Sequence, residues 1–136
     1  MSNKCILLVE DNPDDTTLIV RALKKGNIAN EIVVVQDGLE AIEYLTGKGA
    51  YDGRKVSEQP ALILLDLKLP KLDGIEVLKR VWAEENLKEV PVIVLTSSTE
   101  DRDIIKSYGL GANSYISKPV DFEEFDIASI SFVKRF

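Results

Sequence analysis

Five short apolar runs, separated by longer segments, organise the chain. Three of the runs are nearly continuous in Val, Ile and Leu, without the polar alternation of a half-exposed strand. Strands that are buried on both faces have this pattern, which favours a parallel sheet covered by helices on both sides. The runs are Cys5–Val9, Ile32–Val35, Ala61–Leu65, Val92–Leu95 and Tyr115–Ile116.

The segments between these runs have helical periodicity. The first helix is predicted to start at Pro13 and to stop at Gly26, and the third starts near Asp73, which suits an N-cap. The fourth helix follows the cluster Ser97–Asp101, and the last runs from about Phe122 to the end. Strand and helix thus alternate as (βα)₅, and right-handed crossovers make this a doubly wound α/β sheet. The apolar helical positions are Leu18, Ile19, Ala22, Leu23, Ala41, Ile42, Leu45, Ile75, Leu78, Val81, Trp82, Ile104, Ile105 and Tyr108.

One polar stretch, Gly47–Pro60, stands between the second helix and the third strand. It contains three glycines, and we expect it to lie on the surface. A loop of this length inside a compact domain is either functional or flexible.

Composition excludes several classes of function. The 136 residues include 17 Lys+Arg against 23 Asp+Glu, and a net charge of −6 argues against general nucleic-acid binding. The absence of histidine excludes Ser-His-Asp and Cys-His triads and histidine-ligated metals, and the single cysteine excludes a disulfide framework. Since no apolar stretch has the length of a signal sequence or a membrane helix, we expect a cytoplasmic protein that does not enter membranes.

Chemically capable side chains follow four of the apolar runs. Glu10 and Asp11 follow the first run, Asp66 the third, Thr96 the fourth and Lys118 the fifth. Ligands of an open α/β sheet bind at the carboxyl ends of its strands. Strand ends are commonly polar, so no single position marks a site. Together they bring three carboxylates, a hydroxyl and an ammonium to one edge of the sheet.

Three neighbouring carboxylates repel one another unless a cation neutralises them. A hard divalent ion with oxygen ligands, most simply Mg²⁺, meets this requirement. A carboxylate, a magnesium ion, a hydroxyl and an ammonium are the groups that phosphoryl transfer to an aspartate requires. The carboxylate is the nucleophile, and the cations balance charge on the phosphoryl oxygens.

Four fragments of the sequence resemble the receiver domain of two-component response regulators. They are LLVEDNPDD at the first strand, LILLDLKLPKLDG around Asp66, VIVLTSS at the fourth strand and NSYISKP at the fifth. The resemblance extends over essentially the whole chain and is closest to single-domain, phytochrome-associated response regulators. It implies a flavodoxin-like fold with a five-stranded parallel sheet in the order 2-1-3-4-5. It also implies that residues 1–136 form a single receiver domain with no output domain.

The resemblance implies a role for each matching acid. Asp66 is similar to the phospho-acceptor, and Asp11 to the direct Mg²⁺ ligand, with Glu10 acting beside it through a bound water. The backbone carbonyl of Lys68, two residues past the acceptor, would complete the protein's share of the metal shell.

Three further positions match the receiver pattern. Thr96 would bond one phosphoryl oxygen and Lys118 another. Tyr115 matches the aromatic residue whose rotamer reports phosphorylation. Phosphate on Asp66 would draw Thr96 towards it and let Tyr115 turn inward, as a shift between two existing arrangements.

Without a histidine of its own, the chain needs a phosphoryl donor. That donor is a phosphohistidine on a sensor histidine kinase or a histidine phosphotransfer protein, or a small acyl-type phosphate. The resemblance implies a phospho-accepting signalling protein that catalyses only its own phosphorylation and dephosphorylation. Receivers tune the lifetime of the phosphate at the positions of Lys68 and Ser98. Neither is an acid or an amide, so we predict a long-lived phospho-form.

The output of such a chain is a change in protein–protein contacts. The last helix carries an apolar stripe at Phe122, Phe125, Val133 and Phe136 with further apolar residues beside it. We therefore expect a homodimer through the fourth helix, the fifth strand and the fifth helix, the alternative being a helix buried in its own core. The segment EEFDIASISFVKRF is shorter and richer in β-branched and small residues than the last helix of similar receivers.

Three other functions compete with this interpretation. A haloacid-dehalogenase-like phosphatase would have a second aspartate where this chain has Lys68, so turnover of phosphate esters is disfavoured. A phosphate-independent pseudo-receiver, which is a binding module, is disfavoured by the complete set of site residues. A phosphorelay intermediate, which passes the group to another histidine protein, fits the sequence as well as a terminal regulator does.

Overall fold

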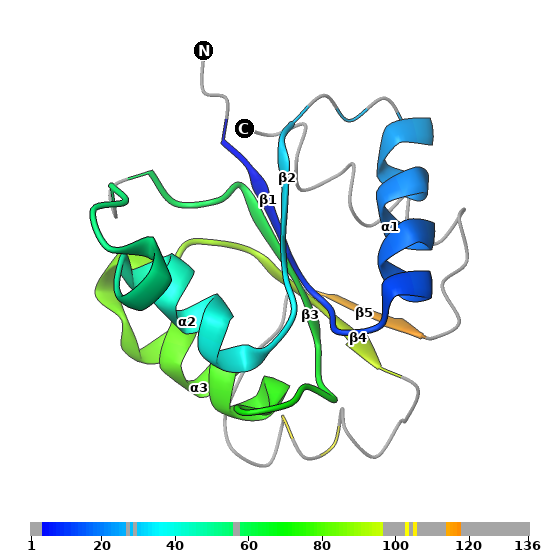
Figure 1. The fold of residues 1–136 in the computed structure, drawn as a ribbon. Helices are drawn as coiled ribbons and strands as arrows, with labels where there is room; N and C mark the ends of the chain where they lie inside the picture. Colours follow the sequence, from blue (N-terminus) through cyan, green and yellow to red (C-terminus); the bar gives the residue numbers. More distant parts are fainter. Residues whose placement is uncertain are drawn as a thin grey trace.

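The structure is a computed structural model that describes residues 4–26, 28, 30–55, 58–96, 103, 105 and 114–117. Its centre is a parallel five-stranded sheet in the order β2-β1-β3-β4-β5 (Figure 1), which confirms the predicted fold. The strands are β1 (Ile6–Val9), β2 (Ile32–Val35), β3 (Leu62–Asp66), β4 (Val92–Thr96) and β5 (Ser114–Ser117).

The apolar runs form strands because they are buried on both faces. Every residue of β1, β3 and β4 is buried, whereas the edge strand β2 is partly exposed at Val34. The strand ends differ slightly from the predicted runs. Asp66 and Thr96 are the last residues of β3 and β4 and belong to the hydrogen-bonded sheet. Their side chains are therefore placed by the strands themselves.

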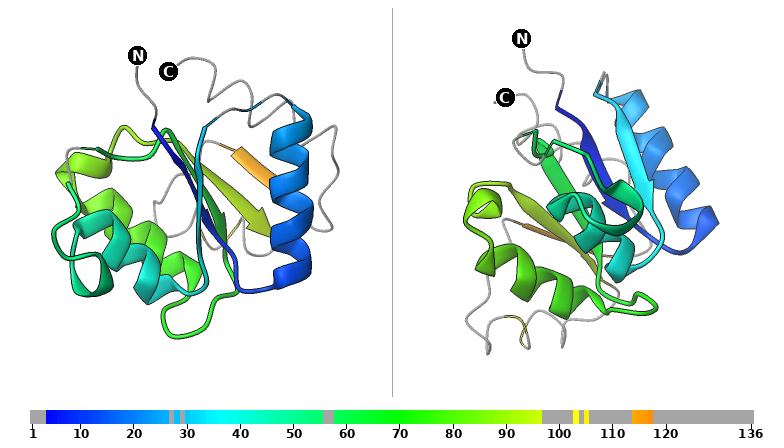
Figure 2. Two further views of the ribbon diagram at one scale, coloured as in Figure 1. Left: turned by 45° about the horizontal axis from the view of Figure 1, so that its top comes forward. Right: turned by 60° about the vertical axis from the view of Figure 1, so that its left-hand side comes forward.

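Helices cover both faces of the sheet (Figures 1 and 2), so the doubly wound layering is confirmed for the described residues. α1 (Pro13–Lys25) packs on one face through Ile19, Ala22 and Leu23. α2 (Gly38–Thr46) and α3 (Gly74–Ala83) pack side by side on the other face. Two short 3₁₀ turns, η1 (Gly49–Tyr51) and η2 (Glu85–Leu87), follow α2 and α3.

Side chains fix the predicted helix starts. Asn12 caps α1, accepting from the backbone N–H groups of Asp14 (2.8 Å) and Asp15 (3.1 Å), and Pro13 stands at the first helical position. Asp73 caps α3 by accepting from Glu76 N–H at 2.9 Å. Such caps satisfy backbone donors that have no partner inside the helix. α1 consequently begins shortly after β1, and α3 begins at the end of the loop that follows β3.

The polar stretch Gly47–Pro60 is attached to α2 along its described part. The ring of Tyr51 meets the ring of Tyr44 edge-on at 5.0 Å, and its hydroxyl donates to Glu40 Oε2 at 2.7 Å. Arg54 lies 4.0 Å from the centre of the Tyr44 ring and donates to the Tyr44 carbonyl at 2.8 Å. The hydrogen bond to Glu40 raises the pKa of Tyr51 to about 12. These contacts hold the described part of the stretch against α2.

Part of the sequence interpretation concerns residues beyond the described ones. Lys118, Ser98, the last helix and most of the predicted dimer surface lie outside the described residues; of the fourth helix, Asp103 and Ile105 are described and are helical. Among the helices that the structure describes, none is long and apolar enough to cross a membrane.

Candidate functional site

The register of the sheet brings Glu10 and Asp66 together. β1 and β3 are parallel neighbours whose last paired residues are Val9 and Leu65. Glu10 and Asp66 each come one residue later, so they stand side by side at the same edge. Both are almost completely buried, with exposed fractions of 1% and 5%.

Asp11 joins these two acids because the chain turns sharply after β1. Asn12 N–H donates to Glu10 Oε2 at 3.2 Å, and the Asn12 side chain starts α1 immediately afterwards. Asp11 is therefore held in the turn between β1 and α1, where it is exposed.

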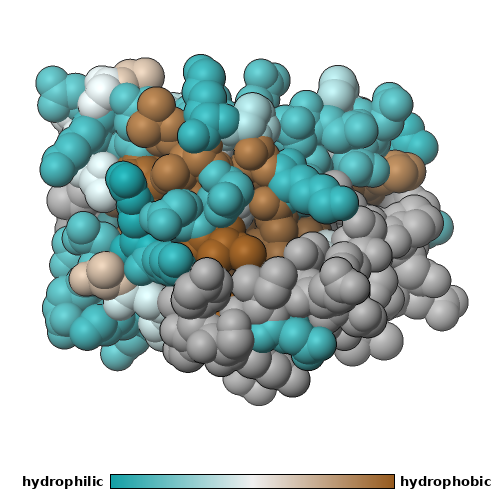
Figure 3. Space-filling model, turned by 90° about the horizontal axis from the view of Figure 1, so that it is seen from below, coloured by the Kyte–Doolittle hydropathy of each residue, from teal (hydrophilic) through white to brown (hydrophobic). Residues whose placement is uncertain are grey.

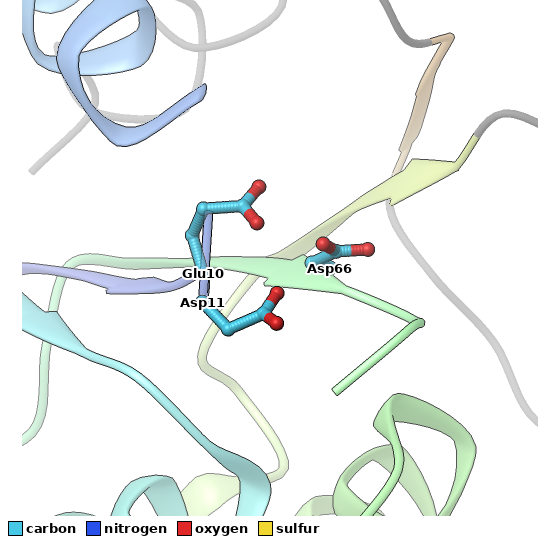
Figure 4. Close-up of side chains that lie close together, drawn as sticks. All are labelled: Glu10, Asp11 and Asp66. Carbon is cyan, nitrogen blue, oxygen red and sulfur yellow. The ribbon is translucent and has the colours of Figure 1, made fainter. Parts of the chain in front are cut away.

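The carboxylates of Glu10, Asp11 and Asp66 form one cluster (Figure 4). One carboxylate oxygen from each lies within 4.8 Å of the others. Two of the acids are buried and one is exposed, so the cluster is open to solvent on the side of Asp11. Three anionic oxygens at this spacing match the all-oxygen donor set that hard divalent cations prefer. The residues present therefore fit a bound Mg²⁺ ion.

The β3–α3 loop (residues 67–73) orients the Asp66 carboxylate. The backbone N–H of Lys68 donates to Asp66 Oδ1 at 3.1 Å. The Lys68 side chain is exposed. Lys68 thus contacts Asp66 through its backbone N–H, whereas its side chain extends into solvent.

Thr96 and Tyr115 lie on the same face of the sheet. β4 and β5 pair Val94 with Tyr115 and Thr96 with Ser117. Because side chains alternate along a strand, Thr96 projects to the face on which Tyr115 lies, two residues further along. Thr96 is buried, and Tyr115 is half-buried against the core under α2 and α3. Thr96 and Tyr115, the predicted switch pair, therefore lie on one face of the sheet.

Two glycines support the β3–α3 loop, and the hydrophobic pattern gives no sign of them. Gly74 N–H donates to the Leu67 carbonyl at 2.9 Å, and a Cβ on Gly74 would lie 2.5 Å from the Asp66 carbonyl oxygen. A Cβ on Gly38 would overlap the carbonyl group of Leu72. Each glycine follows an Asp that caps its helix. The Asp-Gly dipeptide alone does not identify them, because it also occurs at Asp52-Gly53, where a Cβ on the glycine would meet nothing within 4 Å.

Seen from the carboxyl ends of the strands, this face has hydrophobic side chains near its centre, with hydrophilic ones along their upper and left sides (Figure 3). Within the acid cluster, Glu10 and Asp66 are buried at the ends of the central strands, so their charges are screened less by solvent than that of the exposed Asp11.

The chain belongs to the response regulator receiver domain family, whose model matches residues 6–128. The structure and this match together confirm the resemblance seen in the four sequence fragments.

The chain is similar to several response regulators, and two of those described below, RtBRR and RcpA, are named as phytochrome response regulators. The response regulator Rcp1 of Synechocystis sp. is 45% identical over 115 residues, which is 85% of this chain and 76% of Rcp1. The structure of the bacteriophytochrome response regulator RtBRR has a TM-score of 0.88 and 47% identity, covering 98% of this chain and 79% of that one. A Mn²⁺-bound structure of Rcp1 has a TM-score of 0.77 and 41% identity, covering 92% and 88%. The phosphorylated cyanobacterial phytochrome response regulator RcpA has a TM-score of 0.76 and 41% identity, covering 97% and 90%.

Proposed function

We propose that the chain accepts a phosphoryl group on Asp66 from a phosphohistidine of a partner kinase or phosphotransfer protein. The added charge then changes its contacts with other proteins. One observation carries the proposal: Asp66 is buried, and its carboxylate lies in one cluster with those of Glu10 and Asp11 at the carboxyl ends of β1 and β3. The phosphorylated state of the relative RcpA supports it.

Mg²⁺ is the cofactor of this proposal. Asp11, Asp66 and the backbone carbonyl of Lys68 would bind it directly, and Glu10 would act through a water molecule. When bound, the ion supplies positive charge that offsets the carboxylates and the phosphoryl oxygens. The cluster's donor chemistry supports this assignment, and so does the Mn²⁺-bound structure of the relative Rcp1.

The transfer itself requires no acid or base from this chain. A carboxylate oxygen of Asp66 attacks phosphorus, a P–O bond forms, and the P–N bond to the donor imidazole breaks. The imidazole nitrogen keeps the electron pair and takes a proton from solvent or from its own protein. The Lys68 N–H, which holds Oδ1 of Asp66, limits rotation of the carboxylate during the attack. Thr96 and Lys118 are proposed to bond the phosphoryl oxygens.

The same proposal includes the switch. A phosphoryl oxygen that bonds Thr96 favours the arrangement in which Thr96 has moved towards Asp66. Tyr115, on the same face of the sheet as Thr96, then turns into the vacated space. The surface formed by the fourth helix, β5 and the last helix is proposed to respond, as the interface of a homodimer.

The test is phosphorylation by acetyl phosphate, followed by intact-mass measurement and size-exclusion chromatography. The wild type should gain one phosphoryl group in Mg²⁺, and the fraction labelled should collapse in chelator. Asp66→Asn should gain none, whereas Asp73→Asn, which removes an acid outside the cluster, should label like the wild type. Undiminished labelling of Asp66→Asn, or of the wild type in chelator, would refute the proposal.

A further inference from the structure

We propose that Gly38, at the start of α2, is a positioning residue for the chemistry of Asp66. Because Gly38 has no side chain, the β3–α3 loop can lie where Lys68 reaches the acceptor carboxylate. This inference rests on the proposed function and adds to it a residue on an element that supplies none of the acids.

The first turn of α2 contacts the β3–α3 loop at three consecutive residues. Gly38 N–H donates to the Pro70 carbonyl at 3.4 Å. Asp37 Oδ2 lies 3.5 Å from Lys71 Nζ. A Cβ on Gly38 would overlap the carbonyl of Leu72 and lie 2.9 Å from its Cβ. Backbone therefore packs on backbone, and any side chain at position 38 forces the two elements apart.

The loop has little freedom to absorb such a displacement. Lys71 is the central residue of a γ-turn, because Leu72 N–H donates to the Pro70 carbonyl at 2.7 Å and Lys71 has a φ of 66°. A non-glycine residue in this region is already strained. A hydrogen bond from Gly74 N–H to the Leu67 carbonyl joins the two ends of the loop. A push at Leu72 therefore reaches Lys68, since only Leu69 separates Lys68 from Pro70.

The α2 side of the contact is the more firmly held. Both carboxylate oxygens of Glu40, in the first turn of α2, are engaged: Oε1 accepts from Gln36 N–H at 3.0 Å and Oε2 from the Tyr51 hydroxyl at 2.7 Å. Asp37 in addition caps α2 by accepting from Glu40 N–H at 2.7 Å. Because these bonds hold the start of α2, a side chain at position 38 displaces the loop rather than the helix.

The experiment compares Gly38→Ala with Gly47→Ala, both in the full chain. Gly47 ends the same helix with a φ of 65°, so its replacement strains α2 far from the loop. Mg²⁺ affinity is measured by calorimetry, phosphorylation by acetyl phosphate at saturating Mg²⁺, and stability by urea unfolding. Gly38→Ala should bind Mg²⁺ roughly tenfold more weakly and react roughly ten- to a hundredfold more slowly. Gly47→Ala should lose stability and keep both wild-type values.

A second variant keeps the test decisive should Gly38→Ala fail to fold. Lys71→Gly suits the positive φ and so folds without strain, but it frees the loop and removes the contact with Asp37. It should weaken Mg²⁺ binding by roughly two- to fivefold. Wild-type Mg²⁺ affinity and rate in Gly38→Ala, or in Lys71→Gly, would overturn the proposal, as would an equal loss in Gly47→Ala. A wild type that neither binds Mg²⁺ nor is labelled at Asp66 would instead refute the proposed function.

Discussion

Replacing Asp66 by Asn should stabilise the metal-free protein and remove its stabilisation by Mg²⁺. In the native state Asp66 is held close to two further carboxylates, with one oxygen of each within 4.8 Å of the others. Unfolding separates these groups, so their repulsion lowers the free energy of unfolding. An amide has nearly the same shape as the carboxylate and carries no charge.

The magnitude follows from the spacing and the burial. Two unit charges 4.8 Å apart repel by about 0.9 kcal/mol in water and about 3.5 kcal/mol at an effective dielectric constant of 20. Glu10 and Asp66 are buried, whereas Asp11 is exposed and its charge is screened by solvent. We expect Asp66→Asn to raise the free energy of unfolding by about 1–3 kcal/mol in chelator. Each kcal/mol corresponds to a rise of roughly 3–5 °C in Tm.

Urea unfolding, with and without Mg²⁺, measures both effects. At a Mg²⁺ concentration of a hundred times Kd, the wild type should gain about 2.7 kcal/mol, and Asp66→Asn should gain little. Asp73→Asn, which keeps a capping side chain outside the cluster, should respond to Mg²⁺ as the wild type does. A variant at Asp66 that is less stable than the wild type in chelator, or that Mg²⁺ stabilises equally, would refute the electrostatic reasoning.

Three further changes have defined outcomes. Tyr51→Phe should lower the free energy of unfolding by about 1 kcal/mol at pH 7. Since the pKa of Tyr51 is raised in the folded state to about 12, the wild type's extra stability should be complete below pH 10 and vanish as the pH rises through 12. Parallel curves of stability against pH for the two proteins would contradict this. The phosphorylated wild type should be long-lived, and Lys68→Asn should shorten its half-life because the amide would orient the water that attacks the phosphoryl group. Rapid loss of the phosphoryl group that no substitution at Lys68 or Ser98 alters would count against the lifetime argument. Asn12→Ala should lower the free energy of unfolding by about 1 kcal/mol through loss of the α1 cap, and an unchanged urea midpoint would show that the cap is dispensable.

Local patterns were sufficient to predict the strands and the three helices, α1, α2 and α3, that the structure describes. Continuous apolar runs predicted the buried strands, and Pro13 and Asp73 marked the helix starts that the structure shows. The predicted strand ends were less accurate, because a polar residue after an apolar run indicates a loop. The sheet nevertheless includes Asp66 and Thr96. Their backbone pairing depends on the neighbouring strand, which a single segment of sequence does not reveal.

The polar stretch after α2 shows a different kind of missing information. Its glycines and charges indicated only a surface excursion, either functional or flexible. The structure attaches it to α2 through the rings of Tyr44 and Tyr51 and the guanidinium group of Arg54. These contacts join residues up to ten positions apart with no regular spacing, so the periodicity of the sequence does not predict them.

The sequence by itself determined which residue types stand at the strand ends. It therefore predicted that acids able to bind a metal ion, together with a hydroxyl group, lie at the carboxyl-terminal edge of the sheet. Only the tertiary structure decided how close the carboxylates lie and which backbone holds them. The distances depend on the register of β1 against β3 and on the packing of Gly38 and Gly74 against one loop. Both are long-range contacts between segments, and their geometry exists only once the whole sheet and its helices have packed.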